Sequence, residues 1–156
     1  MINLRLRGEF RCTLDVKGRF MLPVALQKQL PVDEREDYRN KLMINRGLDK
    51  CLVLYPVSEW DKIEDDLSKL NDFIEEERRF KRLLKSGLSE IDIDKSSRIV
   101  IPKMLMEHAG IKKNIVLYAD QNKVEVWDEE TYNKHIEENG DDLSVLAEKV
   151  MGGKSE

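Results

Sequence analysis

Apolar and polar positions follow one order near the start of the chain and the same order again in its second half. Apolar residues alternate weakly with polar ones over 10–14, a mostly polar stretch over 15–18 is typical of a turn, and after Arg19 a short apolar run over 20–22 leads to Pro23. Alternation with a period of two is typical of strands, and a proline suits the first turn of a helix. We therefore expect a strand, a tight turn, a second strand and a short helix over 23–30.

The middle of the chain predicts a hairpin followed by two helices. Apolar residues over 42–45 and 51–55 flank a turn-forming stretch, which is typical of two paired strands. Beyond them, a helix is expected to start near Ser58 and to carry Trp60 on its apolar face, because the following apolar residues recur at helical spacing. A second helix is predicted over 72–86.

The segment 94–102 repeats the pattern of 15–23. Each contains an aspartate, an arginine four places later, three apolar residues and a proline, and the two segments begin 79 positions apart (94 minus 15). Leu26 and Leu105 extend the match into the expected helices. Self-similarity over this distance indicates one fold unit that occurs twice.

This repeat sets the predicted organisation of the chain. We expect a first repeat with a helical extension over 8–86, a second repeat with C-terminal helices over 87–150, and a flexible tail over 151–156. Short strands with appended helices cannot bury both faces alone, whereas two interleaved copies can close a small barrel without free edges. The prediction is an α+β fold in which two β-hairpin/helix repeats form one barrel with peripheral helices.

Composition and charge add a preference for association. Hydrophobic residues make up 40% of the chain and charged residues 37%, so the core is small and mutual burial of the two halves, or of subunits, is favoured. The net charge is -4, yet six basic residues face only two acidic ones within the first thirty positions, and the region after 120 is mainly acidic. This distribution allows nucleic-acid contact without overall basicity, and it also allows head-to-tail association of subunits.

Several other classes of function lack support in the sequence. The start of the chain has no signal-peptide run, and no stretch approaches the length of a membrane span, so a cytoplasmic protein without a membrane partner is expected. No catalytic set, metal cluster or nucleotide loop occurs, which predicts neither an enzyme nor a cofactor or small-molecule substrate. His108 and His135 are expected in ordinary roles, and Cys12 and Cys51 as buried reduced thiols.

The predicted turns carry the candidate chemistry. Asp at the first position can accept hydrogen bonds from N–H groups two or three residues on, and glycine permits the positive φ that such a bend often needs. The turn-forming residues are accordingly Asp15 and Gly18, with Asp94 and Ser97 in the second copy. Arg19 has two interpretations that the spacing leaves equal. Its guanidinium reaches outward to phosphate or guanine, or the side chain is structural and pairs with Asp15 or packs its stem over the barrel.

At this point the chain resembles the MraZ family of bacterial proteins. The resemblance rests on two D-x-x-G-R signatures, each followed by an apolar run and a proline, and it extends over Leu54-Tyr55-Pro56, the arginine-rich stretch 77–84 and His108-Ala109-Gly110. It implies an AbrB-like swapped-hairpin barrel made by the two halves of one chain, a ring-shaped homo-oligomer, and a DNA-binding transcriptional regulator. The implied target is a set of short direct repeats upstream of its own operon, which encodes division and cell-wall functions.

One position departs from the family pattern, because Ser97 stands where glycine is expected. A serine at positive φ costs on the order of 1 kcal/mol, so the second turn is expected to bend differently if it avoids that conformation. The DNA-facing candidates carried over from the family are Lys17, Arg19, Lys95 and Arg98. Three further arginines are added on charge alone, namely Arg5, Arg7 and Arg11.

The preferred hypothesis is a nucleoid-associated repressor that binds double-stranded DNA through its turn arginines. Two alternatives remain: a ring-forming interaction scaffold without direct DNA readout, and an antitoxin-like barrel that neutralises a partner through a disordered tail, for which the segment 152–156 is short. The basic run over 78–85 follows three glutamates at pairing distance, which favours a solvated or subunit-facing helix over a second DNA site.

Overall fold

The computed structural model describes residues 3–140 and 142–152 and confirms a mixed α+β fold. Its strands are β1 (Leu6–Thr13), β2 (Arg19–Met21), β3 (Lys41–Arg46), β4 (Leu52–Pro56), β5 (Ser89–Asp92), β6 (Arg98–Val100), β7 (Asn114–Gln121) and β8 (Lys123–Asp128). Its helices are α1 (Val24–Gln27), α2 (Val57–Leu67), α3 (Glu75–Leu84), α4 (Lys103–Ala109), α5 (Glu129–Gly140) and α6 (Leu143–Met151), with a 3-10 turn at Glu36–Tyr38. The predicted tail over 151–156 falls mainly on 153–156, which lie outside the described residues, and the predicted repeat boundaries stay predictions.

Six strands form one antiparallel sheet in the order β1-β7-β8-β4-β3-β5. The first strand of each repeat pairs with the hairpin of the other: β1 lies against β7 with Phe10 opposite Leu117, and β5 lies against β3 with Ile91 opposite Leu42. The two hairpins also join each other through β4 and β8. The repeats are therefore interleaved, as the pattern predicted.

The predicted closed barrel is not confirmed. Within the described residues β1 and β5 are the edges of the six-stranded sheet, and no strand pairing joins them. The short strands β2 and β6 pair with each other in a separate two-stranded sheet instead of bridging those edges. A repeat in sequence shows that two units share partners, but strand register decides whether the outermost strands also meet.

The core lies between the two sheets and the helices that follow β2 and β6. Leu26 on α1 and Leu105 on α4 occupy related positions and are 1% and 2% exposed. Phe20 and Ile99 lie opposite each other in the β2–β6 pair, and both are buried. Burying a side chain of this kind stabilises the fold by roughly 1.5 to 3 kcal/mol. Matching positions in the two repeats thus contribute to one shared core.

Aromatic residues fix the helices that follow each hairpin. Trp60 on α2 is buried and its ring lies 5.2 Å from that of Tyr55, while Tyr132 on α5 is buried with its ring 5.8 Å from that of Trp127. Tyr132 also donates a hydrogen bond from its hydroxyl to the carboxylate of Glu9 at 2.8 Å. The predicted place of Trp60 on the apolar face of its helix is confirmed.

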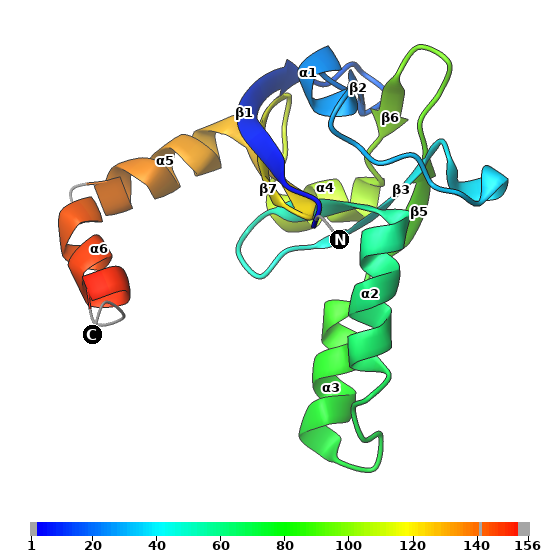
Figure 1. Cartoon of the computed structure of the whole chain (residues 1–156). Coiled ribbons are helices and arrows are strands. Elements are labelled where there is room, and N and C mark those ends of the chain that lie inside the picture. The colour runs from blue at the N-terminus through cyan, green and yellow to red at the C-terminus, as the bar shows by residue number, and fades with distance from the viewer. Residues whose placement is uncertain (1–2, 141, 153–156) are drawn as a thin grey trace.

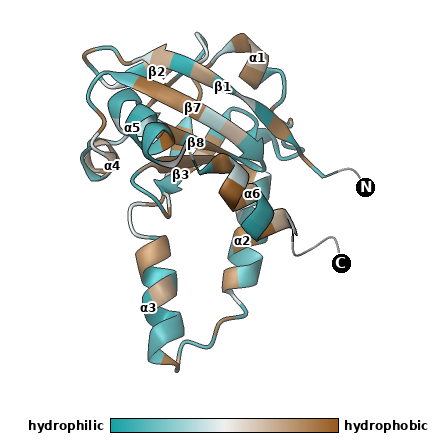
Figure 2. Ribbon diagram, turned by 90° about the vertical axis from the view of Figure 1, so that its left-hand side faces the viewer, coloured by the Kyte–Doolittle hydropathy of each residue, from teal (hydrophilic) through white to brown (hydrophobic). Residues whose placement is uncertain are grey.

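Two helical extensions project from the sheet (Figure 1). α2 and α3 form an arm on the side opposite to β2 and β6, and α5 and α6 lead away from β8. No residue of α3 or α6 is buried, and α6 carries a hydrophobic face that is exposed (Figure 2). Within the described residues, no helix has the length and the apolar content that crossing a membrane requires.

Several element boundaries differ from the predictions. The helix expected over 23–30 is limited to Val24–Gln27 in α1, since the residues after it form a turn. β1 begins at Leu6 rather than at residue 10, because pairing with β7 extends the strand through Arg7, Gly8 and Glu9, where the alternation in the sequence is weak. α3 begins at Glu75 rather than at residue 72, because the residues before it form a turn. The hairpin predicted over 42–45 and 51–55 is confirmed to within one residue at each end.

Candidate nucleic-acid interface

The first candidate site is loop 1, which we define as residues 15–19 between β1 and β2. The carboxylate Oδ1 of Asp15 accepts hydrogen bonds from the main-chain N–H of Lys17 at 2.9 Å and of Arg19 at 3.0 Å. The N–H of Gly18 donates to the carbonyl of Asp15 at 3.0 Å, and the N–H of Asp15 donates to the carbonyl of Arg19 at 2.9 Å. Four hydrogen bonds, two to the carboxylate and two within the main chain, therefore fix the bend.

Loop 2, which we define as residues 94–98, has the same hydrogen bonds. Oδ1 of Asp94 accepts from the N–H of Ser96 at 2.8 Å and of Arg98 at 2.9 Å, and the N–H of Ser97 donates to the carbonyl of Asp94 at 2.9 Å. Ser97 has a φ of 61°, close to the 76° of Gly18. The serine therefore adopts the left-handed conformation despite its side chain, and the different bend expected for this loop is not found.

Each loop holds its arginine by one edge of the guanidinium. Nε of Arg19 lies 2.7 Å from Oδ2 of Asp15, and Nε of Arg98 lies 3.0 Å from Oδ2 of Asp94. The side chains are 28% and 36% exposed, and no partner for their Nη groups is found in the part of the chain that the structure describes. The pairing of Arg19 with Asp15 is thus confirmed, through Nε. Its contact with phosphate or guanine stays a prediction, for which the N–H groups on Nη1 and Nη2 are available.

The aspartates that hold these arginines stay ionised. Hydrogen bonding from the N–H of Arg19 is the main cause that lowers the pKa of Asp15 to about 2. Desolvation opposes it, and the guanidinium of Arg19 and the N–H of Lys17 add to the lowering. The same contacts, led by the N–H of Arg98, lower the pKa of Asp94. Each arginine is therefore held by a charged partner throughout the physiological pH range.

The strand pair β2–β6 joins the two loops into one unit. Arg19 lies opposite Val100 and Arg98 lies opposite Met21 in antiparallel register, so the arginines stand at the two ends of the pair. The loops differ in their lysines, since Lys17 is the third residue of loop 1 and Lys95 is the second residue of loop 2. The structure thus brings together four of the predicted DNA-facing residues.

The three arginines assigned on charge alone are not brought to the loops. Arg7 lies six residues before Thr13 along β1, which places it roughly 20 Å from the loop 1 end of that strand. Arg5 precedes the strand. Arg11 lies 3.3 Å from a carboxylate oxygen of Glu9 and 3.6 Å from one of Glu129, so its charge is offset locally. Arg5, Arg7 and Arg11 stay predictions without a shared site.

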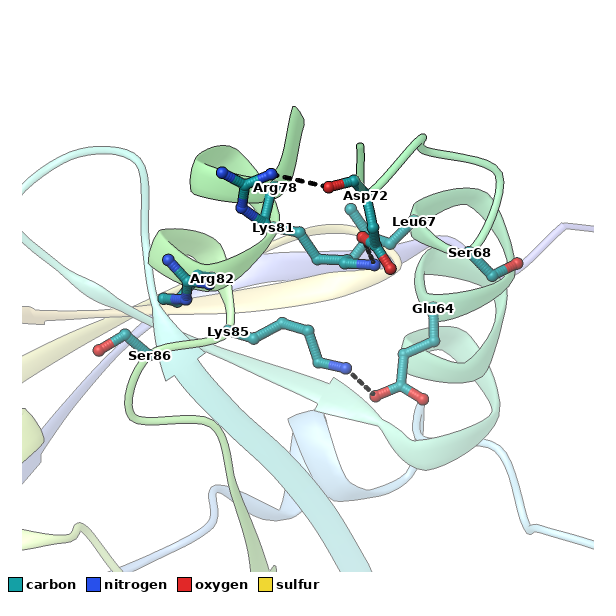
Figure 3. Close-up of a pocket in the computed structure, with 9 residues that line it drawn as sticks. All are labelled: Glu64, Leu67, Ser68, Asp72, Arg78, Lys81, Arg82, Lys85 and Ser86. Carbon is teal, nitrogen blue, oxygen red and sulfur yellow. Dashed lines mark hydrogen bonds and ion pairs between the residues drawn. The ribbon is translucent and has the colours of Figure 1, made fainter. Parts of the chain in front are cut away.

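A groove between α2 and α3 is the main rival site (Figure 3). It has a volume of about 830 Å³ and contains several cations of the basic run. Lys81 lies 2.6 Å from a carboxylate oxygen of Asp72, Lys85 lies 3.5 Å from one of Glu64, and Arg78 donates to the carbonyl of Asp72 at 2.8 Å. Because acids in the same groove offset these cations, it is a weaker anion site than the loops.

The remaining chemistry candidates are ordinary. Cys51 is 1% exposed and burial is the main cause that raises its pKa to about 12, while Cys12 is half-buried, and both are free thiols. His135 stacks on Trp127 with ring centres 5.1 Å apart. Within the described residues, no group of His, Cys, Asp and Glu side chains could hold a metal ion.

A basic cleft lies beside loop 1 and was not predicted from the sequence. The cleft has a volume of about 740 Å³, and its lining includes three lysines outside the loops, namely Lys103, Lys112 and Lys113. The only signal for it in the sequence is the adjacent pair Lys112-Lys113 just before β7. Their position beside loop 1 depends on pairing between the repeats, which a local pattern does not reveal.

The interleaved repeats and the duplicated arginine loop define a protein made of two tandem copies of one unit. Both copies match the sequence model of a family described as "MraZ protein, putative antitoxin-like", over residues 6–83 and 84–151. The chain therefore belongs to the MraZ family.

Relatives named "Transcriptional regulator MraZ" are similar over most of the chain. The one from Cytophaga hutchinsonii is 38% identical over 144 residues, which cover 92% of this chain and 93% of the relative. The one from Christiangramia forsetii is 39% identical over 152 residues, covering 97% and 95%. The one from Pediococcus pentosaceus is 36% identical over 144 residues, covering 92% and 95%.

Proposed function

We propose that this protein is a transcriptional regulator that binds double-stranded DNA through loops 1 and 2. One observation carries the proposal: Arg19 and Arg98 are each held through Nε by an ionised aspartate on one strand pair, with their Nη groups directed to no partner among the described residues. The names of the relatives support the same function.

The geometry suits both kinds of contact that a duplex offers. Two Nη donors of a fixed guanidinium match the O6 and N7 acceptors of guanine, or two oxygens of a phosphate. Lys17 and Lys95 are exposed beside the arginines and supply point charges for neighbouring phosphates. Base contacts by the arginines would give specificity, and phosphate contacts by the lysines would give position and affinity.

The finer proposal concerns the target and the assembly. The protein would act in the cytoplasm at the nucleoid as a repressor of its own cell-division and cell-wall operon, and it would bind short direct repeats upstream as a ring-shaped homo-oligomer. Exposed apolar residues on α6 support self-association, since Leu143, Val145 and Val150 are 72%, 64% and 52% exposed. A ring that presents the same loops several times would bind spaced repeats by avidity.

Titration of the upstream duplex, followed by fluorescence anisotropy, tests the DNA-binding proposal. Replacing Arg19 by Ala is expected to weaken binding about 5- to 150-fold if the arginine makes a bidentate base contact. Arg79→Ala is the matched control, because it removes the same charge from an exposed position on α3. Equal affinity of the Arg19 and Arg79 variants, with both folded, would remove loop 1 from the interface.

A second titration tests avidity. A duplex with two or more correctly spaced repeats is expected to bind far more tightly than a duplex with one repeat, and inserting half a helical turn between the repeats should abolish the gain. If one isolated repeat binds as tightly as the array, the ring proposal is wrong.

The alternative function is a ring-forming interaction scaffold. The exposed apolar residues of α3 and α6 favour it, since they offer surface for protein contact. A scaffold without DNA readout would show the same weak affinity for upstream and random duplexes, and Arg19→Ala would have no more effect than Arg79→Ala.

A further inference from the structure

The cleft beside loop 1 is built from both repeats. Loop 1 and the preceding Leu14 form one wall, and the segment from Val100 to the start of α4 forms another, with the residues just before β7 closing it. Of the residues that line this cleft, only Asp15 is acidic, and its carboxylate is occupied by Arg19 and by two main-chain N–H groups. The cleft is therefore positively charged overall.

Most of the lysines in the cleft are available for a ligand. Lys17, Lys103 and Lys113 are exposed, and no hydrogen bond or ion pair of their ammonium groups is found within residues 3–140 and 142–152. Lys112 differs, because its ammonium lies 3.2 Å from a carboxylate oxygen of Glu130. Three free cations in one cleft favour an anionic ligand.

Main-chain hydrogen bonds fix two of these lysines relative to loop 1. The N–H of Leu14 donates to the carbonyl of Lys113 at 2.8 Å, and the N–H of Ile101 donates to the carbonyl of Gly18 at 3.0 Å, which holds the start of α4 against the loop. Val100 both lines the cleft and lies opposite Arg19 in the strand pair. The cleft is therefore continuous with the surface around Arg19.

The related positions beside loop 2 lack this charge. The carbonyl of Asn40 accepts from the N–H of Ile93 at 2.8 Å, as the carbonyl of Lys113 accepts from Leu14, so Asn40 takes the place of Lys113. Val24 follows Pro23 as Lys103 follows Pro102, so a valine takes the place of Lys103. The two loops are alike in backbone but differ in the charge that surrounds them.

We propose that this cleft binds the sugar–phosphate backbone of the duplex, with Lys103 and Lys113 contacting phosphates that flank the site of Arg19. The inference rests on the proposed DNA-binding function and extends it, because it adds two residues and makes the contacts of the two loops unequal. Beside Arg19, loop 1 binds the backbone through Lys17 and the cleft, whereas the positions beside loop 2 that correspond to Lys103 and Lys113 are the uncharged Val24 and Asn40.

Binding titrations of the full chain at several salt concentrations test the proposal, with the upstream duplex and a random duplex as probes. Lys103→Ala and Lys113→Ala are each expected to make the negative slope of log affinity against log salt shallower by about 0.9. Each should also weaken binding to both duplexes by a similar factor. Lys149→Ala, which removes an exposed lysine from α6, is the control and should leave the slope unchanged.

A gain of charge provides the second variant. Val24 is 64% exposed, so Val24→Lys is expected to keep the fold. It should make the negative slope of log affinity against log salt steeper by about 0.9 and strengthen binding to both duplexes. Circular dichroism spectra of all variants check that they are folded.

The outcomes separate the inference from the function on which it rests. If Arg19→Ala weakens binding while the slopes of the Lys103 and Lys113 variants equal that of the Lys149 control, the cleft does not contact DNA and the proposed function stands. If the unchanged protein binds neither duplex even at low salt, both the cleft proposal and the proposed function are overturned.

Discussion

The carbonyl of Ser97 accepts a hydrogen bond from the N–H of Leu22 at 2.8 Å, so the left-handed residue of loop 2 is bonded to the strand end that leaves loop 1. The reciprocal bond joins the N–H of Ile101 to the carbonyl of Gly18 at 3.0 Å. Each loop thus depends on the other for the position of its left-handed residue. We therefore expect a substitution at Gly18 or Ser97 to affect both loops.

The first prediction concerns backbone strain in loop 2. Ser97→Gly is expected to raise the free energy of unfolding by up to about 1 kcal/mol, because glycine adopts positive φ without the cost that a Cβ imposes. Gly18→Ala should lower it by about 1 kcal/mol or more, since an added Cβ would also lie 3.3 Å from the sulfur of Met106. Urea denaturation measures both effects, and opposite signs for the two variants are the diagnostic result.

The second prediction concerns the aspartates as positioning residues. Asp15→Asn keeps an oxygen that can accept the main-chain N–H groups but loses the charge that holds Nε of Arg19. We expect binding to random DNA to strengthen slightly, because a negative charge is removed, and the ratio of specific to random affinity to fall, because the guanidinium is less fixed. An unchanged ratio for this variant would contradict the positioning role.

The third prediction concerns stability in acid. The pKa of Asp15 is lowered in the folded protein from 3.8 to about 2, so its contribution to stability is present above pH 3.8 and is lost as the pH falls from there toward 2. Asp15→Asn removes this contribution. The stability of the unchanged protein should therefore fall more steeply between pH 4 and 2 than that of the variant, as measured by urea denaturation at each pH.

The same aspartate should have no effect on pH dependence near neutrality. Asp15 stays ionised between pH 5 and 8, so the variant and the unchanged protein should show parallel stability profiles over that range. Divergent profiles there would show that another titrating group is affected by the substitution.

The fourth prediction concerns the shared core. Leu26→Ala and Leu105→Ala each empty a fully buried position and are expected to lower the free energy of unfolding by about 2 to 5 kcal/mol. Because the two leucines occupy related positions in one core, each variant should unfold in a single transition. Separate transitions for the two halves, seen by calorimetry, would contradict the interleaved core.

Local patterns predicted those parts of the fold that local chemistry determines. The hairpin β3–β4 follows from apolar runs on both sides of a turn-forming stretch. The bend of loop 1 follows from the hydrogen-bonding capacity of Asp15 and the conformational freedom of Gly18. The match between Leu26 and Leu105 in the repeat correctly placed both in the helices that follow the prolines. In each of these cases the deciding interactions lie within a few residues or are duplicated in the sequence.

Long-range pairing decided the parts that were not predicted. Lys113 reaches loop 1 because its carbonyl accepts from Leu14, a contact between residues that lie far apart in the chain. The additional residues of β1 are in the strand because β7 lies beside them, despite weak alternation. The closed barrel was predicted from the repeat and from the family resemblance, and the register of the outer strands, which determines closure, has no local signal.

The exchange of first strands between the repeats limits how the chain can be divided. β1 finds its neighbour in β7, and β5 finds its neighbour in β3, so cutting the chain between α3 and β5 would leave each half with a strand that has no partner of its own. Two such fragments would have to associate before either could complete its sheet. Fusion of the two units into one polypeptide makes that encounter intramolecular, so that it no longer depends on concentration.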